Sequence, residues 1–284
     1  MLRIDTFQDW SRIEAELADW PLELEVLCSM PLSRAADRTD IASKPGHETP
    51  FQAVIRSQDV AIGAIAQSSD EVTVAIGPGA PVDETAHLLA ADFDARFDTL
   101  PRLFGSTQLV EKAAQLLAER RGVSVEPGMS DRFYQLHEPI APARQASGSA
   151  RLATGEDLEP VAAWIEAFVR DAELPALDGR DLGTYLIAKD AVFLWLDGGE
   201  PVSMAAIGGQ TPRCARIGFV YTPDSLRSRG YAAAITDVTT RRALDAGRVT
   251  CCLLADTHNP LTNRLYQRLG YRHIGDAIDI GFSQ

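Results

Sequence analysis

Two arginines lie between a predicted strand and a predicted helix, close to a glycine. Arg227, Arg229, Gly230 and Ala232 form the pattern R-x-x-G-x-A. The first turn of a helix presents unpaired backbone N–H groups and the positive end of the helix dipole, so this turn suits a pyrophosphate. Gly230 allows a close backbone approach, and the arginines add charge-assisted hydrogen bonds. Because the pattern is short, an ordinary strand-to-helix turn with solvated arginines is the alternative.

A second segment with polar side chains lies nearer the C-terminus. Asn259 precedes Pro260, which suits the first position of a helix, and Gly270 suits the C-terminal end of that helix. Tyr266 then lies about two turns after Asn259. A phenol keeps its proton at neutral pH and can donate it to a leaving group. The alternative for Tyr266 is a packed helix residue beside Leu265.

In this order and separation, the two segments resemble the GNAT superfamily of acyl-CoA-dependent N-acyltransferases, over roughly residues 150–282. The resemblance implies that the CoA pyrophosphate is held by Arg227, Ser228, Arg229, Gly230, Tyr231 and Ala232. Ser228 stands where many relatives carry glycine, and its backbone can still donate a hydrogen bond. Acetyl-CoA is the expected acyl donor.

The resemblance also implies roles for the strand and for the second segment. Backbone groups of Phe219, Val220 and Tyr221 would pair with the pantetheine arm, as an added strand pairs with the edge of a splayed sheet. Asn259 would hydrogen-bond the pantetheine amides, and Tyr266 would be the catalytic residue that protonates the departing thiolate.

The general base is not fixed by the sequence. The family often uses a glutamate on a central strand, but the predicted strand 213–221 contains no carboxylate. The nearby candidates are Asp171, Glu173, Glu166 and Asp256. A water relay, or an amine that arrives already neutral, would also serve.

The cysteines and histidines indicate no metal site and no disulfide framework. Cys28, Cys214, Cys251 and Cys252 contain no C-x-x-C pair, and we expect them to be small apolar core residues. The five histidines lack the spacing of metal ligands. His258 either lines the acceptor site or is a solvated loop residue. Free cysteines favour a reducing cytoplasm.

The elements predicted for the C-terminal half have the order βααβββ, then αβαβ. Hydrophobic periodicity predicts a strand at 150–153, helices from 158 and over 181–189, and strands at 191–196, 201–207 and 215–221. A helix to about 246, a strand at 249–255, a helix at 260–269 and strands at 271–274 and 277–282 follow. This order predicts a mixed α/β fold with parallel and antiparallel pairings in one sheet, and the resemblance implies a mostly antiparallel, twisted sheet flanked by helices.

The N-terminal half shows a similar but weaker order. Helices are predicted at 9–17 and 22–36, strands at 51–56, 60–66 and 71–76, helices at 83–97 and 108–121, and a closing strand at 132–137. Residues 36–50 are predicted to be a loop. The matching order indicates an internal duplication and hence two GNAT-like domains, at 1–140 and 150–284. Residues 141–149, rich in alanine and serine, have the composition of a linker.

The first half lacks the residues that carry the chemistry of the second. At an offset of 148 residues, Gly122 aligns with Gly270, but Ala118 stands opposite Tyr266. Acidic residues Asp83 and Glu84 lie near the position of the arginine loop, where they would repel a pyrophosphate. We expect this half to be a degenerate domain that walls the acceptor cleft or forms a homodimer surface. A non-homologous α/β domain is the alternative.

Composition limits the classes of partner. The 284 residues carry 27 Lys and Arg against 40 Asp and Glu, a formal net charge of −13. This charge disfavours nucleic acids and anionic membranes and mildly favours a cationic amine acceptor, either a small molecule or a protein. We expect no signal peptide, because the N-terminal residues carry charges throughout and lack an apolar segment, and we expect no membrane span, because no apolar run is long enough.

Two functional hypotheses follow. The first is an N-acetyltransferase that moves an acetyl group directly from acetyl-CoA to an amine. The second is a non-catalytic CoA-binding sensor or regulatory module, which the missing strand carboxylate supports. Substitution of Tyr266 separates the two, because a pure binder does not need the acid.

Overall fold

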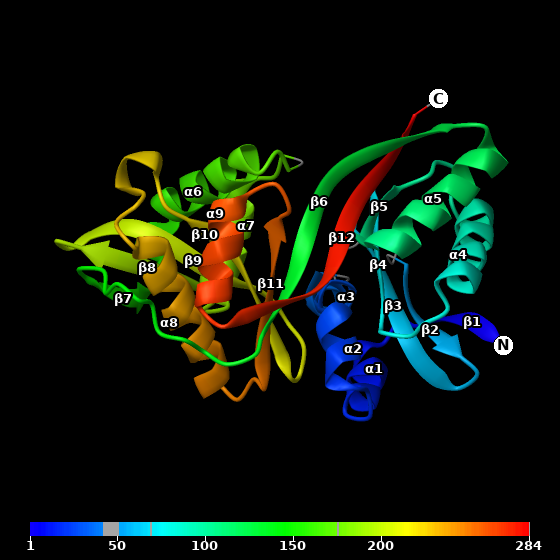
Figure 1. Cartoon of the computed structure of the whole chain (residues 1–284), viewed down its shortest axis with the longest axis horizontal. Coiled ribbons are helices and arrows are strands. Elements are labelled where there is room, and N and C mark those ends of the chain that lie inside the picture. The colour runs from blue at the N-terminus through cyan, green and yellow to red at the C-terminus, as the bar shows by residue number, and fades with distance from the viewer. Residues whose placement is uncertain (42–50, 69, 175, 284) are drawn as a thin grey trace. The chain divides into compact units, whose positions relative to one another are not determined.

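The computed structural model describes residues 1–41, 51–68, 70–174 and 176–283, and its contacts divide the chain into two units (Figure 1). The first unit comprises Met1–Phe133 and Ile274–Gln284, and the second comprises Tyr134–His273. Two long strands, β6 (Ser124–Leu136) and β12 (Tyr271–Ser283), contribute residues to both units. The predicted domain boundary at 141–149 stays a prediction. The two units change after Phe133 and again after His273, and not at this segment.

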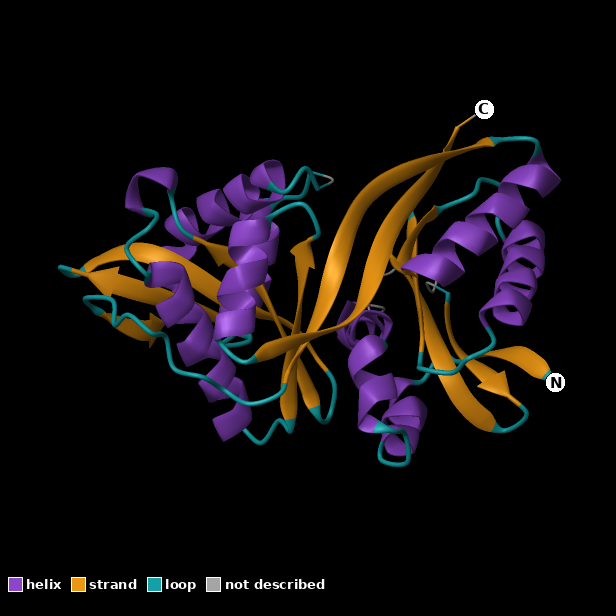
Figure 2. Ribbon diagram, viewed as in Figure 1, coloured by secondary structure: helices purple, strands orange, loops and turns teal. Residues whose placement is uncertain are grey.

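The second unit alternates strands and helices around one sheet (Figure 2). Its strands, besides the end of β6, are β7 (Ser149–Leu152), β8 (Val192–Asp197), β9 (Glu200–Gln210), β10 (Cys214–Tyr221) and β11 (Thr250–Asp256). Its helices are α6 (Leu158–Asp171), α7 (Gly179–Ala188), α8 (Tyr231–Asp245) and α9 (Pro260–Arg268), with 3₁₀ turns at Gly155–Asp157 and Asp224–Leu226.

In the second unit, the pairs β7–β8, β8–β9 and β9–β10 are antiparallel. The order is β6-β11-β10-β9-β8-β7, and β10 and β11 are parallel. A parallel pair needs a crossover connection, and α8 supplies it between β10 and β11. The parallel pair therefore puts the loop that precedes α8 at the C-terminal end of β10.

Alternation along β8 shows how the two faces of this sheet are covered. Val192 and Leu194 pack with residues of α6 and α7, whereas Phe193 and Trp195 pack with residues of α8. Successive strand residues point to opposite faces, so α6 and α7 cover one face and α8 covers the other.

The strands of the first unit have the order β1-β2-β3-β4-β5-β12-β6. Its own strands are β1 (Leu2–Thr6), β2 (Gln52–Ser57), β3 (Val60–Ser68), β4 (Glu71–Ile76) and β5 (Arg102–Ser106). Its helices are α1 (Trp10–Leu17), α2 (Leu22–Leu27), α3 (Ser29–Ile41), α4 (Val82–Arg96) and α5 (Thr107–Arg121). Strands β4 and β5 are parallel, and β12 pairs antiparallel with β5, from Ala277 opposite Ser106 to Ile280 opposite Leu103.

Two apolar clusters cover the faces of this sheet. Ala53 and Ile55 of β2 pack with α4 and α5, while Val54 between them packs with α1 and α3. The helices of the first unit therefore lie on both faces, as in the second unit.

The predicted fold class is confirmed: both units are mixed α/β, with mostly antiparallel sheets flanked by helices. The helices at 9–17, 83–97 and 108–121 correspond to α1, α4 and α5. The helix predicted at 22–36 is two helices, because the chain leaves helical geometry at Cys28, and α3 runs on to Ile41 into the predicted loop. The rest of that loop, 42–50, lies outside the described residues. Strands β1 and β5 were not predicted, and β12 is one strand rather than two.

Candidate functional site

Strands β10 and β11 are in register only over their first residues. The parallel pairing runs from Cys214 opposite Thr250 to Arg216 opposite Cys252. Further along β10, Gly218 faces Ala206 of β9 and Tyr221 faces Met204, so β10 carries one extra residue there. This β-bulge bends the strand and places Phe219 at a φ of 49°, in the left-handed region. The last part of β10 therefore departs from the regular ladder.

The turn after β10 is fixed by buried hydroxyl groups. The Ser203 hydroxyl of β9 donates to the carbonyl oxygen of Tyr221 at 2.8 Å and lies 2.8 Å from the Thr222 hydroxyl. Ser203 is fully buried, so these bonds hold the end of β10 rigidly. Neither residue was predicted from the sequence, because an isolated serine or threonine in a strand carries no distinctive signal.

The predicted anion loop leads directly into α8. Ser228 and Gly230 both have positive φ, 66° and 91°, and Gly230 is the N-cap of α8 without a side-chain hydrogen bond. Helix geometry leaves the N–H groups of the first turn without intrahelical partners. Because Ser228, Arg229 and Gly230 are at the surface or only half-buried, this loop presents amide donors and the positive end of α8 to solvent.

The two arginines of the loop have different environments. Arg227 donates to the carbonyl oxygen of Thr222 at 3.0 Å and forms ion pairs with Asp171 at 3.0 Å and with Asp224 at 2.8 Å. Its guanidinium therefore ties the loop to the end of α6. Among the described residues, Arg229 makes one long hydrogen bond, 3.4 Å, to the carbonyl oxygen of Ser225, and its charge helps to lower the pKa of Asp197. Arg229 is thus the freer cation of the two.

Tyr231 and Ala232 begin α8, and their side chains face the protein interior to different degrees. Tyr231 is 3% exposed and its hydroxyl donates to Asp197, whose pKa is lowered by that bond and by a bond from Ser147. The Tyr231 side chain therefore anchors α8, and only the backbone of this residue is left for a ligand. Ala232 is half-buried.

Asn259 is the N-cap of α9. Its side-chain oxygen accepts from the N–H groups of Leu261 at 3.2 Å and Thr262 at 3.3 Å. The Asn259 amide nitrogen, in contrast, makes no hydrogen bond with the described residues, which leaves two donors for a ligand.

A buried polar pair supports this helix start from below. Asn263 donates to the carbonyl oxygens of Asp256 at 2.8 Å and Asn259 at 2.7 Å, and its own side-chain oxygen accepts from the Tyr134 hydroxyl at 2.7 Å. Asn263 is 4% exposed and Tyr134 is fully buried. The sequence analysis missed both. The available signal was the position of Asn263, four residues after the N-cap and therefore on the same side of the helix as Asn259.

Tyr266 lies in the apolar cluster between β10 and β11. It is 8% exposed and shares this cluster with Ile217 and Val220 of β10 and Leu253 of β11. Burial raises the pKa of Tyr266 to about 12, because the phenolate is poorly solvated there. Its hydroxyl makes no hydrogen bond with the described residues. Tyr266 is therefore a protonated, unpaired donor at neutral pH, and the fold brings it together with the predicted pantetheine strand.

Four half-buried aromatic residues lie on the α6 side of β10. Phe168 contacts Phe219 with ring centroids 5.4 Å apart, and Trp164 contacts Tyr221 at 6.2 Å. The bulge turns Phe219 toward α6, so the strand offers a flat apolar surface beside its irregular end.

The four carboxylates considered as bases are unequal in the structure. Asp171 is paired with Arg227, and Asp256 accepts from the N–H of His258 at 2.8 Å. Glu166 and Glu173 are exposed. His258 is 83% exposed, which agrees with a solvated loop residue.

In the first unit, the elements that correspond to β10, β11 and the start of α8 leave little space for a ligand. Strand β4 pairs with β3 without a bulge, and Leu24 of α2 lies over Gly77, where an added Cβ would be 2.7 Å from it. A small cavity beside β4 and β5 has a volume of about 20 Å³ and is lined by residues that include Met30, Phe104 and Phe133. That volume holds at most one water molecule. The first turn of α4 is acidic, with Asp83 and Glu84.

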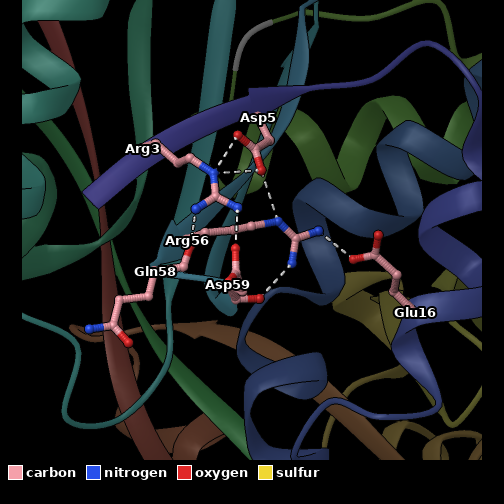
Figure 3. Close-up of polar contacts among 6 residues, drawn as sticks. All are labelled: Arg3, Asp5, Glu16, Arg56, Gln58 and Asp59. Atoms are coloured by element: carbon pink, nitrogen blue, oxygen red, sulfur yellow. Dashed lines mark hydrogen bonds and ion pairs between the residues drawn. The ribbon is translucent and has the colours of Figure 1, made fainter. Parts of the chain in front are cut away.

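A charged groove of about 890 Å³ lies between β1, α1 and the β2–β3 hairpin of the first unit (Figure 3). Arg56 pairs with Asp5 at 3.0 Å and also with Glu16, and Arg3 pairs with Asp5 at 3.0 Å and Asp59 at 3.2 Å. These groups satisfy one another, so the network stabilises the hairpin and does not present a free charge.

Among the described residues, no group of three or more histidine, cysteine, aspartate or glutamate side chains could hold a metal ion. The four cysteines are buried and free, and burial raises the pKa of Cys251 to about 12. Their prediction as core residues is confirmed. Within the described ranges, no helix is both long and apolar enough to cross a membrane.

Comparison with solved structures places this architecture among known folds. The chain resembles a GNAT-family acetyltransferase from Colwellia psychrerythraea, with a TM-score of 0.55, 15% identity and 99% of each chain covered. It also resembles a GCN5-related N-acetyltransferase from Sphaerobacter thermophilus, with a TM-score of 0.58, 16% identity, and 99% and 95% of the two chains covered. A tandem GNAT protein from the clavulanic acid biosynthesis pathway matches with a TM-score of 0.50 and 12% identity, over 100% and 98%.

These identities show a shared fold alone. No curated protein matches the sequence. The family model described as the Acetyltransferase (GNAT) family matches residues 158–271, which include the bulged strand, the anion loop, Asn259 and Tyr266. The second half of this chain therefore contains an acetyltransferase domain of the GNAT family.

Proposed function

We propose that this protein is an N-acetyltransferase that moves an acetyl group directly from acetyl-CoA to an amine acceptor. The observation that carries the proposal is the position of Tyr266. Its protonated hydroxyl has no partner among the described residues, and it belongs to the apolar cluster that includes Ile217 and against which Val220 packs, both from the strand that would bind pantetheine.

The donor would bind along β10 and at the start of α8. The bulged end of β10, at Phe219, Val220 and Tyr221, supplies backbone groups outside the regular ladder for the pantetheine arm. The amides of residues 228–232 and the guanidinium of Arg229 would hold the pyrophosphate. Arg227 would act mainly through the loop conformation, since its side chain binds Asp171, Asp224 and Thr222. The Asn259 amide nitrogen would donate to pantetheine.

The reaction needs one acid at the sulfur. The neutral amine attacks the thioester carbonyl, a C–N bond forms, and the C–S bond breaks as the tetrahedral intermediate collapses. The departing thiolate takes the Tyr266 proton, and the proton lost by the amine returns to the tyrosinate through water. A pKa near 12 keeps the phenol protonated at working pH, so it is ready to donate.

The acceptor would approach from the α6 side. The aromatic surface formed by Trp164, Phe168, Phe219 and Tyr221 offers apolar contact for an amine-bearing small molecule or protein segment. The net charge of −13 favours the encounter with a cationic amine. Buried free cysteines fit a cytoplasmic location.

The first half would be a GNAT-like domain that no longer binds CoA. The small volume of the cavity beside β4 and β5, the regular pairing of β4 and the acidic start of α4 support this role. Such a domain would then have a role other than donor binding, such as forming a homodimer surface.

Steady-state kinetics of Tyr266→Phe tests the proposal. A screen of amines with acetyl-CoA first identifies an acceptor for the wild-type protein. Loss of the acid should lower kcat about 10²- to 10⁴-fold, while the affinity for acetyl-CoA stays within about twofold, because no donor contact is removed. Tyr271→Phe is the matched control, since its hydroxyl lies 2.6 Å from the Thr240 hydroxyl in the same cluster. Full turnover by Tyr266→Phe would contradict the role of Tyr266 as the acid, whereas a wild-type protein that binds acetyl-CoA but acetylates no amine would favour the sensor hypothesis.

A further inference from the structure

The segment that joins β6 to β7 is bound along the second unit (Figure 1). At its beginning, the N–H groups of His137 and Ile140 donate to the carbonyl oxygens of Gly270 at 3.0 Å and Leu269 at 3.1 Å. At its end, the carbonyl oxygen of Ser147 accepts from the Trp195 indole at 2.7 Å. Despite its linker-like composition, the segment is held at both ends.

The middle of this segment lies against the predicted anion loop. Ala146 is 8% exposed and packs in one cluster with Tyr231. A Cβ placed on Gly230 would be 3.7 Å from the Ala146 Cβ and 4.0 Å from the Arg144 carbonyl oxygen. The segment therefore forms one side of the turn that begins α8.

A hydrogen-bond network fixes this contact. The Ser147 hydroxyl donates to Asp197 at 2.7 Å, and the same carboxylate oxygen accepts from the Tyr231 hydroxyl. Asp197 thus connects the segment to the first residue of α8. Arg144 precedes Ser147 by three residues, so its backbone is held beside Gly230.

The Arg144 side chain is an unpaired cation at this position. It is exposed and forms no ion pair or hydrogen bond with the described residues. The chain has 40 acidic residues against 27 basic ones, yet two arginines lie near Gly230 here: Arg229 precedes it in the chain, and the Arg144 carbonyl oxygen is 4.0 Å from a Cβ placed on it. An arginine that is free of carboxylates beside a set of unpaired amides is suited to bind phosphate oxygens.

We propose that Arg144 is a further phosphate-binding residue of the donor site, supplied by the segment between the two halves. The inference rests on the proposed function. Arg144 would contact the phosphates of CoA, either the pyrophosphate or the 3′-phosphate of the adenosine. The segment that joins β6 to β7 would then contribute a residue to the donor site, in addition to connecting the two strands.

The test is the dissociation constant of acetyl-CoA for the full chain, measured by calorimetry at low salt. Arg144→Ala should weaken binding about fivefold, in the range expected for an exposed charge-assisted hydrogen bond. The effect should shrink as salt is raised, and Arg144→Lys should restore part of the affinity. The melting temperature should not change, because the side chain has no partner in the described protein.

Arg242→Ala is the matched control. Arg242 is also exposed and lies in the last turn of α8, whereas Gly230 precedes the first turn, about 18 Å away at the helical rise. Both variants change the net charge equally, so long-range steering is equal in the two. Equal affinities for Arg144→Ala and Arg242→Ala would overturn the inference.

Acetyl-3′-dephospho-CoA distinguishes the two phosphates. If the Arg144→Ala effect persists with this donor, Arg144 binds the pyrophosphate, and if it disappears, Arg144 binds the 3′-phosphate. Both results support the inference. Absence of acetyl-CoA binding by the wild-type protein would overturn the proposed function and this inference together, whereas wild-type binding with an inert Arg144 would overturn the inference alone.

Discussion

The hydrogen bond from Tyr134 to Asn263 gives a sharp prediction about how the site is supported. Tyr134→Phe removes only the hydroxyl that donates to the Asn263 side-chain oxygen at 2.7 Å. Both residues are at most 4% exposed, so water cannot replace the donor without opening the cluster. A buried acceptor left without a partner costs about 1–3 kcal/mol. We expect the free energy of unfolding to fall by about 2 kcal/mol.

Guanidinium unfolding measures this change: the denaturant concentration at the midpoint should fall, while the dependence of the unfolding free energy on denaturant stays the same. A double-mutant cycle with Asn263→Ala isolates the pair, because Asn263 also holds the Asp256 and Asn259 carbonyl oxygens. The cycle should return a coupling of about 1 kcal/mol or more. A Tyr134→Phe protein as stable as wild type, or a coupling near zero, would refute the view that this pair holds the start of α9.

Two further predictions concern stability. Asp157 accepts from Arg151 at 2.7 and 2.8 Å and from the N–H of Thr154 at 2.7 Å, and these contacts lower its pKa from 3.8 to about 2. Because folding stabilises the charged form, Asp157 contributes about 2 kcal/mol to the free energy of unfolding above pH 5. This contribution falls to roughly half by pH 3, as the carboxylate becomes protonated in the unfolded chain. The gap in unfolding free energy between wild type and Asp157→Asn should narrow in that range, and a gap that is constant from pH 7 to pH 3 would contradict this. Gly270→Ala should cost about 3 kcal/mol or more, since φ is +98° and a Cβ would overlap the Glu138 carbonyl oxygen. Gly122→Ala is the control, because Gly122 has φ +67° with no atom within 4 Å, and it should lower the free energy of unfolding by about 1 kcal/mol. Thermal unfolding of both variants measures the difference. Equal losses of stability would show that the segment at Glu138 does not restrict the side chain at position 270.

Much of the fold could be predicted because most helices have strong apolar periodicity and clear end signals. Pro260 and Gly270 set the limits of α9, and the apolar residues of 215–221 and 249–255 identified β10 and β11. The short β1 and β5 were missed, since β5 is only Arg102–Ser106 and β1 alternates charges with apolar residues at the very start of the chain. The pairing of β12 with β5 depends on contacts between distant segments, which periodicity does not contain.

The candidate site was predictable where a local motif exists. The turn at 227–232 and the helix start at Asn259 both lie where expected. The bulge at Phe219 was not predictable, because it depends on the register of β10 against β9. The pairing of Arg227 with Asp171 was not predictable either, since these residues come from a loop and the end of a distant helix. Linker-like composition also concealed that Ala146 and Ser147 dock beside α8.

The most direct test of the account is the number of acetyl-CoA molecules that one chain binds. Calorimetric titration of the wild-type protein and of the Arg227→Ala/Arg229→Ala variant measures it. The account predicts one equivalent per chain for the wild type and an affinity at least tenfold lower for the variant. Two equivalents would contradict the loss of CoA binding in the first half, and unchanged binding by the variant, or none by the wild type, would contradict the placement of the donor at the start of α8.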